Sequence, residues 1–385
     1  MAVVSADRDA RLAALGFDVD RQRLARAYKW RRSVLSAIRI VVYIAISVWL
    51  LTGFTFTLKA WAGAFGGGIA EVALYTVLLY FLYWIPVIPI GIVGGLVLER
   101  RYGLSTQGTR SWLGDAAKSL GIGLGFSVLG VEVIYFLIAS APELWWLYAW
   151  VAAMIVGVVV AWLGPVVLAP LFYKFEPLAD VALAARLSAL ADRAGTKVIG
   201  VFRMIASTKT TRAFGGLSGI GNTRRIVISD TLLNRYTPDE VETVIAHELG
   251  HHVHRDMLWL LAAGAAGSLA GLIAVDRILR AAVPALGLTS ISDIAGLPLI
   301  ALAIAAVSTV VAPIVNTVSR IREAKADAYA VAMTGKRDAF RTTLVKIHDQ
   351  NLGVVDPHPL AEFLFHDHPS GRRRVEVVFE SRESL

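Results

Sequence analysis

Apolar residues are gathered into six long segments, each separated from the next by a polar or charged stretch. Each segment is long enough for the roughly 20 residues that an α-helix needs to cross the hydrocarbon of a bilayer. The six segments are residues 34–58, 69–98, 116–140, 144–172, 257–279 and 295–318. The pattern predicts six transmembrane helices, the first four within residues 34–172 and the last two within residues 257–318.

Three stretches outside these segments carry most of the charge. Residues 1–33 combine leucines with arginines, a pattern typical of an amphipathic helix that lies on a membrane surface. Residues 173–256 contain an alanine-rich helical pattern and β-branched runs such as KVIGVFRMI, which predict a small α+β domain. Residues 319–385 continue the sixth apolar segment and then become polar. The expected fold class is an α-helical polytopic membrane protein with a small α+β domain.

The distribution of lysine and arginine indicates how the chain crosses the membrane. These residues are frequent before the first apolar segment and between the second and third, whereas the loop SAPE between the third and fourth contains none. By the positive-inside rule the N-terminus is cytoplasmic, and six crossings return both charged stretches of the second half to that side. The net charge of +8 then reflects this asymmetry and an attraction to anionic lipids. The expected partner is the bilayer, and nucleic acid is not expected.

The stretch VIAHELGHHVHRD, residues 244–256, holds four histidines and one glutamate. On a helix, His247 and His251 project from the same face, so both imidazoles can reach one metal ion. The other two histidines of the stretch point elsewhere. Glu248 lies beside the pair, where it can contact a water in the open position of the ion. Because the chain has no cysteine, any metal site must use nitrogen and oxygen ligands.

A third metal ligand is expected in SRIREAKADAYA, residues 319–330, which continues the sixth apolar segment. Glu323 can complete a His-His-Glu set, and Asp327, one helical turn later, can accept a hydrogen bond from the far nitrogen of a ligating histidine. The alternative is a solvated helix in which Glu323 forms ion pairs with Arg320 or Arg322. A His-His-Glu set beside a second glutamate favours Zn²⁺, one ion per chain.

In combination, HELGH followed by R-x-x-E-x-x-AD resembles the membrane-integral M48 zinc metallopeptidases, the Ste24-like CAAX prenyl proteases. The similar motifs span about residues 205–375 in the order KTTRA, GNTRRIVISDTLL, HELGH, SRIREAKADAYA and HPSGRRR. The resemblance implies a gluzincin-type zinc peptidase domain on the cytoplasmic side of a bacterial cell membrane. Eukaryotic members are described with seven spans, so six spans indicate either a missed segment or a shorter, bacterial-type member.

The resemblance also assigns roles to residues outside the metal motif. His368, in FHDHPSGRRRV, corresponds to a histidine that stabilises the oxyanion, and Arg374 to an arginine that orients this histidine or the ligands. Without the family, His368 could belong to an ordinary polar turn. Where members have N-A-x-x-x-G, an ungapped comparison places Phe214 and Gly215. These two residues and Gly216 are expected to lie on an extended, substrate-binding edge.

The expected function is zinc-dependent endopeptidase activity on membrane-associated substrates. The resemblance implies either C-terminal processing of CAAX proteins or quality control of membrane proteins, as in the related HtpX-like proteases. The alternative is a catalytically weakened or inactive membrane-binding or scaffold protein, because Phe214 replaces the family's asparagine. A transporter is disfavoured, since the ionisable residues gather at one membrane border. The expected partners are a peptide or membrane-protein substrate and the lipid bilayer.

Overall fold

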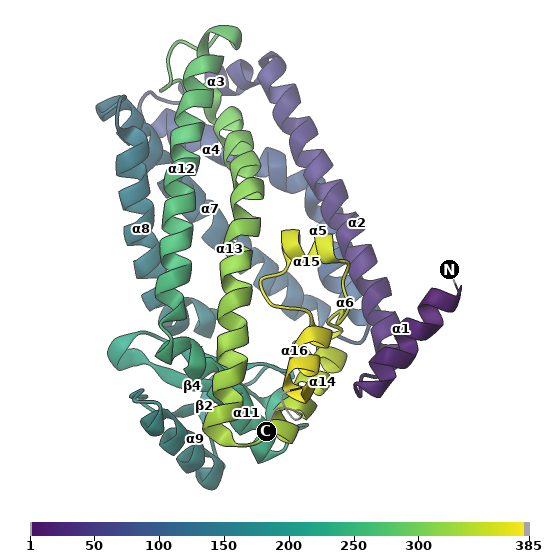
Figure 1. The fold of residues 1–385 in the computed structure, drawn as a ribbon. Helices are drawn as coiled ribbons and strands as arrows, with labels where there is room; N and C mark the ends of the chain where they lie inside the picture. The colour runs from purple at the N-terminus through teal and green to yellow at the C-terminus, as the bar shows by residue number, and fades with distance from the viewer. Residues whose placement is uncertain (1, 381–385) are drawn as a thin grey trace.

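Six helical segments run side by side through the computed structural model, which describes residues 2–380 (Figure 1). Each is long and apolar enough to cross a membrane. They are Val19–Gly63, Ile69–Arg101, Thr109–Ser140, Trp145–Leu171, Asp256–Ala285 and Ile294–Thr334. The prediction of six spans is therefore confirmed. Five of the helical segments extend beyond the apolar segment that predicted them, and the fourth lies within its own.

Glycine and proline interrupt several of the spans. The first two spans consist of α2 (Val19–Trp49), α3 (Thr55–Gly63), α4 (Ile69–Trp84), α5 (Ile88–Ile92) and α6 (Leu98–Arg101). The other four are built on α7 (Thr109–Ser140), α8 (Trp145–Leu163), α12 (Asp256–Ala285) and α13 (Leu297–Thr334). Gly53, with a φ of 135°, separates α2 from α3. Pro86 and Pro89 lie at the breaks in the second span, where each removes a helical hydrogen bond.

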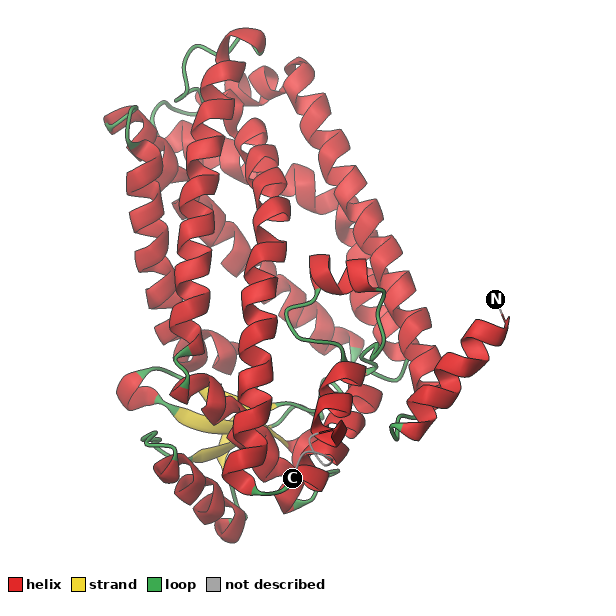
Figure 2. Ribbon diagram, viewed as in Figure 1, coloured by secondary structure: helices red, strands yellow, loops and turns green. Residues whose placement is uncertain are grey.

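A four-stranded sheet lies at one end of the spans, where Figure 2 draws the strands in yellow. Its strands are β1 (Phe175–Pro177), β2 (Val201–Met204), β3 (Gly215–Ser218) and β4 (Arg225–Ser229), in the order β1-β2-β4-β3. β2 and β4 are parallel, and the other two pairs are antiparallel. β3 is therefore an edge strand that pairs only with β4 within the described residues.

Shorter helices complete the part of the chain that follows the fourth span and lies outside the last two spans, and those before the fifth span pack against the sheet. They are α9 (Val181–Arg193), α10 (Asp230–Leu233), α11 (Pro238–Val253), α14 (Arg337–Asn351), α15 (Pro359–Phe365) and α16 (Gly371–Glu380). α11 packs against β3, α9, α13 and α14, so it occupies the centre of the domain. Two of its neighbours, α12 and α13, continue from the domain into the spans. The metal motif of α11 is thus placed at the border between the domain and the membrane helices.

Residues 2–33 belong to two helices rather than to one amphipathic segment. α1 (Ala2–Ala14) ends before Gly16, and α2 begins at Val19 and continues without a break into the first span. Asp18 caps α2 by accepting hydrogen bonds from the backbone of the next turn. Leu12 is buried in the core of the small domain. This leucine therefore contacts protein instead of the membrane surface.

Candidate metal centre

The helix that carries the metal motif begins at a well-defined cap. Thr237 accepts a hydrogen bond from the backbone N–H of Glu240, and Glu240 Oε2 accepts one from the backbone N–H of Thr237 at 2.8 Å. This reciprocal pair satisfies two backbone donors that a helix start otherwise leaves unpaired. Further along α11, a Cβ atom on Gly250 would lie 3.1 Å from the backbone of Ala326. The absence of a side chain there lets α11 lie close against α13.

This close approach brings together three side chains from two helices that could hold a metal ion. His247 Nε2 and His251 Nε2 on α11 are 3.2 Å apart. Glu323 on α13 places Oε2 3.4 Å from His247 Nε2 and Oε1 3.2 Å from His251 Nε2. Tetrahedral zinc with ligand bonds of 2.0–2.1 Å separates its donor atoms by about 3.3 Å. Oε2 of Glu323 is buried without a hydrogen-bond partner within the described residues. The three side chains therefore fit a zinc ion.

A carboxylate oxygen lies close to the Nδ1 atom of each of the two histidines. Asp327 Oδ1 lies 2.9 Å from His247 Nδ1, and Asp256 Oδ2 lies 2.8 Å from His251 Nδ1. Such contacts fix the tautomer of a ligating histidine and orient its ring. Burial lowers the pKa of His247, but its contacts with Asp327 and Glu323 outweigh burial and raise that pKa to about 9. Both imidazoles therefore present Nε2 to the carboxylate of Glu323.

Asp256 is a part of the site that the sequence did not reveal. It is the first residue of α12 and is 1% exposed. Arg255, which precedes it, has a φ of 55°, and this left-handed residue turns the chain so that Asp256 faces back toward His251. Arg322, on α13, forms an ion pair with Asp256. No helical periodicity extends across such a turn, so spacing alone could not identify the contact.

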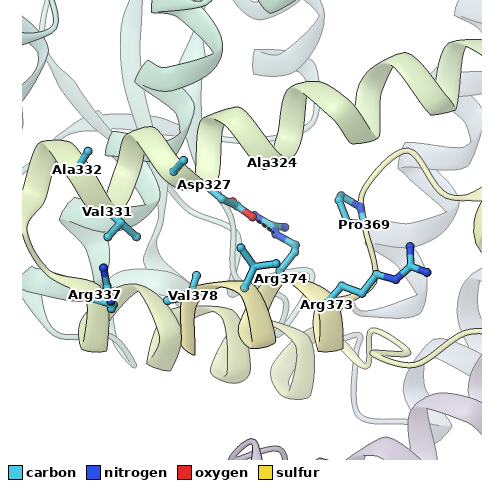
Figure 3. Close-up of a pocket in the computed structure, with 11 residues that line it drawn as sticks. Ala324, Asp327, Val331, Ala332, Arg337, Pro369, Arg373, Arg374 and Val378 are labelled. Atoms are coloured by element: carbon cyan, nitrogen blue, oxygen red, sulfur yellow. Dashed lines mark hydrogen bonds and ion pairs between the residues drawn. The ribbon is translucent and has the colours of Figure 1, made fainter. Parts of the chain in front are cut away.

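Arg374 supports the site through Asp327. The guanidinium of Arg374, on α16, donates two hydrogen bonds to the Asp327 carboxylate, at 2.8 and 2.6 Å. Figure 3 shows these two side chains pointing toward one another between α13 and α16. A guanidinium nitrogen also lies 3.8 Å from Glu323 Oε2. Arg374 is thus placed to orient the metal-binding side chains rather than to contact a substrate.

Glu248 and His368 both lie near the three side chains that could hold a metal. Burial raises the pKa of Glu248, while the nearby His247 and His251 lower it. A carboxylate whose pKa is raised toward neutrality is a better proton acceptor. His368, in the loop between α15 and α16, has its Nε2 3.2 Å from Glu323 Oε1 and its Nδ1 2.8 Å from Asp367. Its side chain is 52% exposed, so it remains accessible from outside.

The edge strand β3 lies directly beside Glu248. A Cβ atom on Gly216 would lie 3.3 Å from Glu248 Oε2, and one on Gly215 would lie 3.3 Å from Val244. These glycines therefore allow α11 to lie against the strand. The side chain of Phe214 packs against Met204 and Val227 of the sheet. Phe214 thus belongs to the apolar packing of the sheet and does not face the metal-binding side chains.

Asn351 and Ser229 hold the beginning of β3 in position. The Asn351 side chain accepts a hydrogen bond from the backbone N–H of Ala213 and donates one to its carbonyl oxygen, both at 2.9 Å. The backbone of Phe214 faces β4, because the N–H of Ser229 donates a hydrogen bond to the Phe214 carbonyl oxygen at 2.9 Å. In an antiparallel sheet the bonding direction alternates along a strand. The backbone groups of Gly215 and Leu217 therefore point to the open edge.

Comparison with known proteins gives matches over nearly the whole chain. Residues 177–381 match the profile of peptidase family M48, and residues 13–174 match the profile described as CAAX prenyl protease N-terminal, five membrane helices. Within residues 13–174, the structure has four spans.

Individual relatives and one solved structure agree with these profiles. An uncharacterized metalloprotease of Bacillus subtilis, YhfN, is 33% identical over 73% of the chain and 67% of its own length. A probable CAAX prenyl protease 1 of Schizosaccharomyces pombe is 26% identical over 76% of the chain and 62% of its own length. The crystal structure of S. mikatae Ste24p superposes with a TM-score of 0.83 at 22% identity, covering 94% and 89% of the two chains. The chain spans about two thirds of the length of the two sequence relatives.

Proposed function

The chain belongs to peptidase family M48 and is a zinc metalloprotease embedded in a membrane, and from this premise we propose which residues perform its chemistry. His247, His251 and Glu323 hold one zinc ion, and Asp327 and Asp256 orient the two histidines. The proposal rests on the separations of 3.2–3.4 Å among the three donor groups. The His-His-Glu set beside a separate glutamate is the arrangement of a catalytic zinc site with an open position.

The proposed reaction is hydrolysis of a peptide bond. A bound zinc supplies Lewis acidity, which polarises the scissile carbonyl and a water. Glu248 accepts the proton of the attacking water and passes it to the leaving amine. His368 donates a hydrogen bond to the carbonyl oxygen as negative charge develops on that atom. Arg374 holds Asp327, and through it His247, in a fixed orientation during these steps.

The substrate is proposed to bind as an extended strand along the open edge of β3. Gly215 and Leu217 direct their backbone groups to this edge, and Glu248 lies beside Gly216. An added strand would form backbone hydrogen bonds with these two residues and run past the general base. Phe214 contributes packing in this arrangement, because its side chain contacts Met204 and Val227. Its presence therefore gives no support to the alternative of an inactive scaffold protein.

The metal centre is proposed to act on substrates at the cytoplasmic border of a bacterial cell membrane. α11 is followed at once by the fifth span, and Glu323 lies on the helix of the sixth span. The relative in Schizosaccharomyces pombe carries the name probable CAAX prenyl protease 1, which favours processing near the C-terminus of lipid-modified proteins. Turnover of damaged membrane proteins is the second candidate. Cleavage of matched peptides with and without a prenyl group distinguishes the two.

The orientation can be tested because the chain lacks cysteine. Lys197→Cys, in the small domain, and Glu143→Cys, between the third and fourth spans, each introduce a single thiol. With the small domain in the cytoplasm, a membrane-impermeant maleimide labels the second variant in intact cells and the first only after permeabilisation. The reverse labelling pattern would overturn the proposed orientation.

The proposed chemistry is tested with the Glu248→Gln variant. Purified full-length protein is assayed for bound zinc and for cleavage of a quenched fluorogenic peptide. We expect wild type and variant to hold equal zinc, while the variant loses most of its turnover because it lacks the proton acceptor. Glu176→Gln, an exposed glutamate on β1, is the matched control and should cleave normally. Turnover of Glu248→Gln at the wild-type rate would exclude Glu248 as the general base.

A further inference from the structure

A cleft of about 850 Å³ lies between the first span and the loop that carries His368. The wall on α2 is formed by side chains that recur every three or four residues, on one face of the helix. They are Lys29, Arg32, Ser33, Ser36, Ala37 and Ile40. The opposite wall includes the loop from Phe365 to Gly371. None of the three proposed metal ligands lines this cleft, but His368 and Arg374 do, so the cleft adjoins the metal centre.

The character of the α2 wall changes along the helix axis. Lys29 and Arg32 are cationic, Ser33 and Ser36 present hydroxyl groups, and Ile40 is apolar. From Lys29 to Ile40 the helix rises about 16 Å at 1.5 Å per residue. A phospholipid has the same order of groups over a similar length, from phosphate through the polar glycerol region to an acyl chain.

The positive charges of Lys29 and Arg32 on this wall are not fully neutralised by ion pairs within the described residues. Lys29 is exposed and forms no ion pair within the described residues. Arg32 lies 3.0 Å from Glu99, but this carboxylate also binds Arg212 at 2.9 Å, so one anion faces two guanidinium groups. The pKa of His366, across the cleft, is lowered first by burial and then by the charge of Lys29. An anion placed between Lys29 and Arg32 would meet net positive charge on the α2 wall, because the acidic side chain that lines the cleft, Asp367, lies on the opposite wall and pairs with His368 at 2.8 Å.

The two ends of the cleft correspond to two levels of a bilayer. The apolar segment of the first span starts at residue 34, so Lys29 and Arg32 lie at its cytoplasmic edge, where anionic lipid head groups are found. Val41 is 64% exposed on the membrane side of this edge. On the opposite wall Phe365 is 71% exposed. The cleft thus leads from head-group level to the level of the acyl chains.

We propose that this cleft binds one anionic phospholipid. Its phosphate lies between Lys29 and Arg32, and its glycerol region accepts hydrogen bonds from the hydroxyl groups of Ser33 and Ser36. An acyl chain follows the helix past Ile40 toward the apolar region. The head group also contacts the loop from His366 to Gly371, so the lipid lies against the segment that presents His368.

The test measures lipid binding to full-length, detergent-purified protein by native mass spectrometry. The probes are phosphatidylglycerol and phosphatidylcholine with the same acyl chains. We expect one phosphatidylglycerol to bind about tenfold more tightly than phosphatidylcholine. Lys29→Gln should weaken phosphatidylglycerol binding about fivefold, while Lys29→Arg retains it. Arg110→Gln removes an equal charge from the exposed start of the third span and should leave binding unchanged.

Four results would overturn the proposal. Equal affinity for the two lipids, or equal affinity of wild type and Lys29→Gln, would exclude a specific anionic lipid. Binding of glycerol 3-phosphate as tight as that of the lipid would identify a phosphate site without a lipid. Unchanged lipid binding in Lys29→Gln, together with a higher KM for peptides ending in a free carboxylate, would assign the cleft to the substrate. The first three outcomes are read from binding alone, so they do not depend on the proposed peptidase chemistry; only the fourth uses proteolysis.

Discussion

Asp256 Oδ2 lies 2.8 Å from His251 Nδ1, although the two residues belong to different helices. Asp256 is the first residue of a membrane span, and His251 is in the last turn of the helix in the small domain. The orientation of a metal-binding imidazole is thus determined by the point at which the chain enters the membrane. The same carboxylate pairs with Arg322 of the sixth span, so three helices meet at this contact.

Replacement of Asp256 by asparagine should weaken zinc binding. The amide keeps the volume of the side chain but orients the His251 ring less strongly, and loss of such a contact reduces metal affinity about 10- to 100-fold. Competition with a chelator measures the change. Peptidase activity should return when zinc is added in excess. Glu176→Gln, far from the metal, provides the control, and an unchanged zinc affinity in Asp256→Asn would contradict the role given to Asp256.

Replacement of Gly216 by alanine should reduce turnover without removing the metal. The new Cβ atom would lie 3.3 Å from Glu248 Oε2, so the carboxylate must shift by a few tenths of an ångström. Small misplacements of a catalytic group lower the rate, here by up to about tenfold. Steady-state kinetics should show a lower kcat with normal zinc content. Ser218→Ala on the same strand is the control, and equal kcat values for the two variants would contradict the argument.

Replacement of Arg374 by alanine should destabilise the small domain. The Asp327 carboxylate is 9% exposed and would lose both of its hydrogen bonds to the guanidinium. Removal of one partner from a buried ion pair costs about 3 to 5 kcal/mol. Thermal unfolding of metal-free protein measures the effect. Arg373→Ala removes the neighbouring arginine, which is 59% exposed and pairs with Glu362 at 3.5 Å, and it should cost about 1 kcal/mol or less. A similar loss of stability in Arg374→Ala and Arg373→Ala would contradict a stabilising role of the buried pair between Arg374 and Asp327.

Acid should destabilise the fold through His348. Burial lowers the pKa of His348 to about 4, and its Nδ1 donates to the Leu344 carbonyl oxygen at 2.7 Å. The unfolded chain has a pKa near 6.5 and takes up the proton first, so stability is complete above about pH 6.5 and falls toward pH 4. The loss is at most about 1.4 kcal/mol per pH unit. Between pH 6.5 and pH 4, metal-free His348→Gln should lose less unfolding free energy than metal-free wild type. If the two proteins show the same dependence of unfolding free energy on pH, His348 is not the source of the acid sensitivity.

The spans and the grouping of His247 with His251 were predictable because they depend on local spacing. A long apolar segment has few alternatives to a membrane helix, and two histidines four residues apart on a helix share a face. Glu323 was predicted because a zinc site with two histidines needs a third protein ligand, and the structure places Glu323 beside both histidines. The catalytic roles of Glu248 and His368 remain predictions, which the experiments above address.

Other features depend on contacts that local spacing does not describe. The support of His251 by Asp256 requires the left-handed turn at Arg255, and arginine carries no sequence signal for that conformation. The side chain of Phe214 packs into the sheet, which an ungapped comparison of motifs could not indicate. The division of residues 1–33 at Gly16 likewise separates two helices that a single amphipathic pattern had joined.

α13 carries Glu323 near one end of a helix of 38 residues, about 57 Å long, whose other end lies at the far side of the spans. A tilt of about 1° at one end of such a rod displaces the other by roughly 1 Å, which is enough to lower the rate of a catalytic site about 100-fold. Helices adjust their tilt to the thickness of the surrounding bilayer. We therefore expect the rate of this enzyme to depend on the thickness of the bilayer, and hence on lipid chain length.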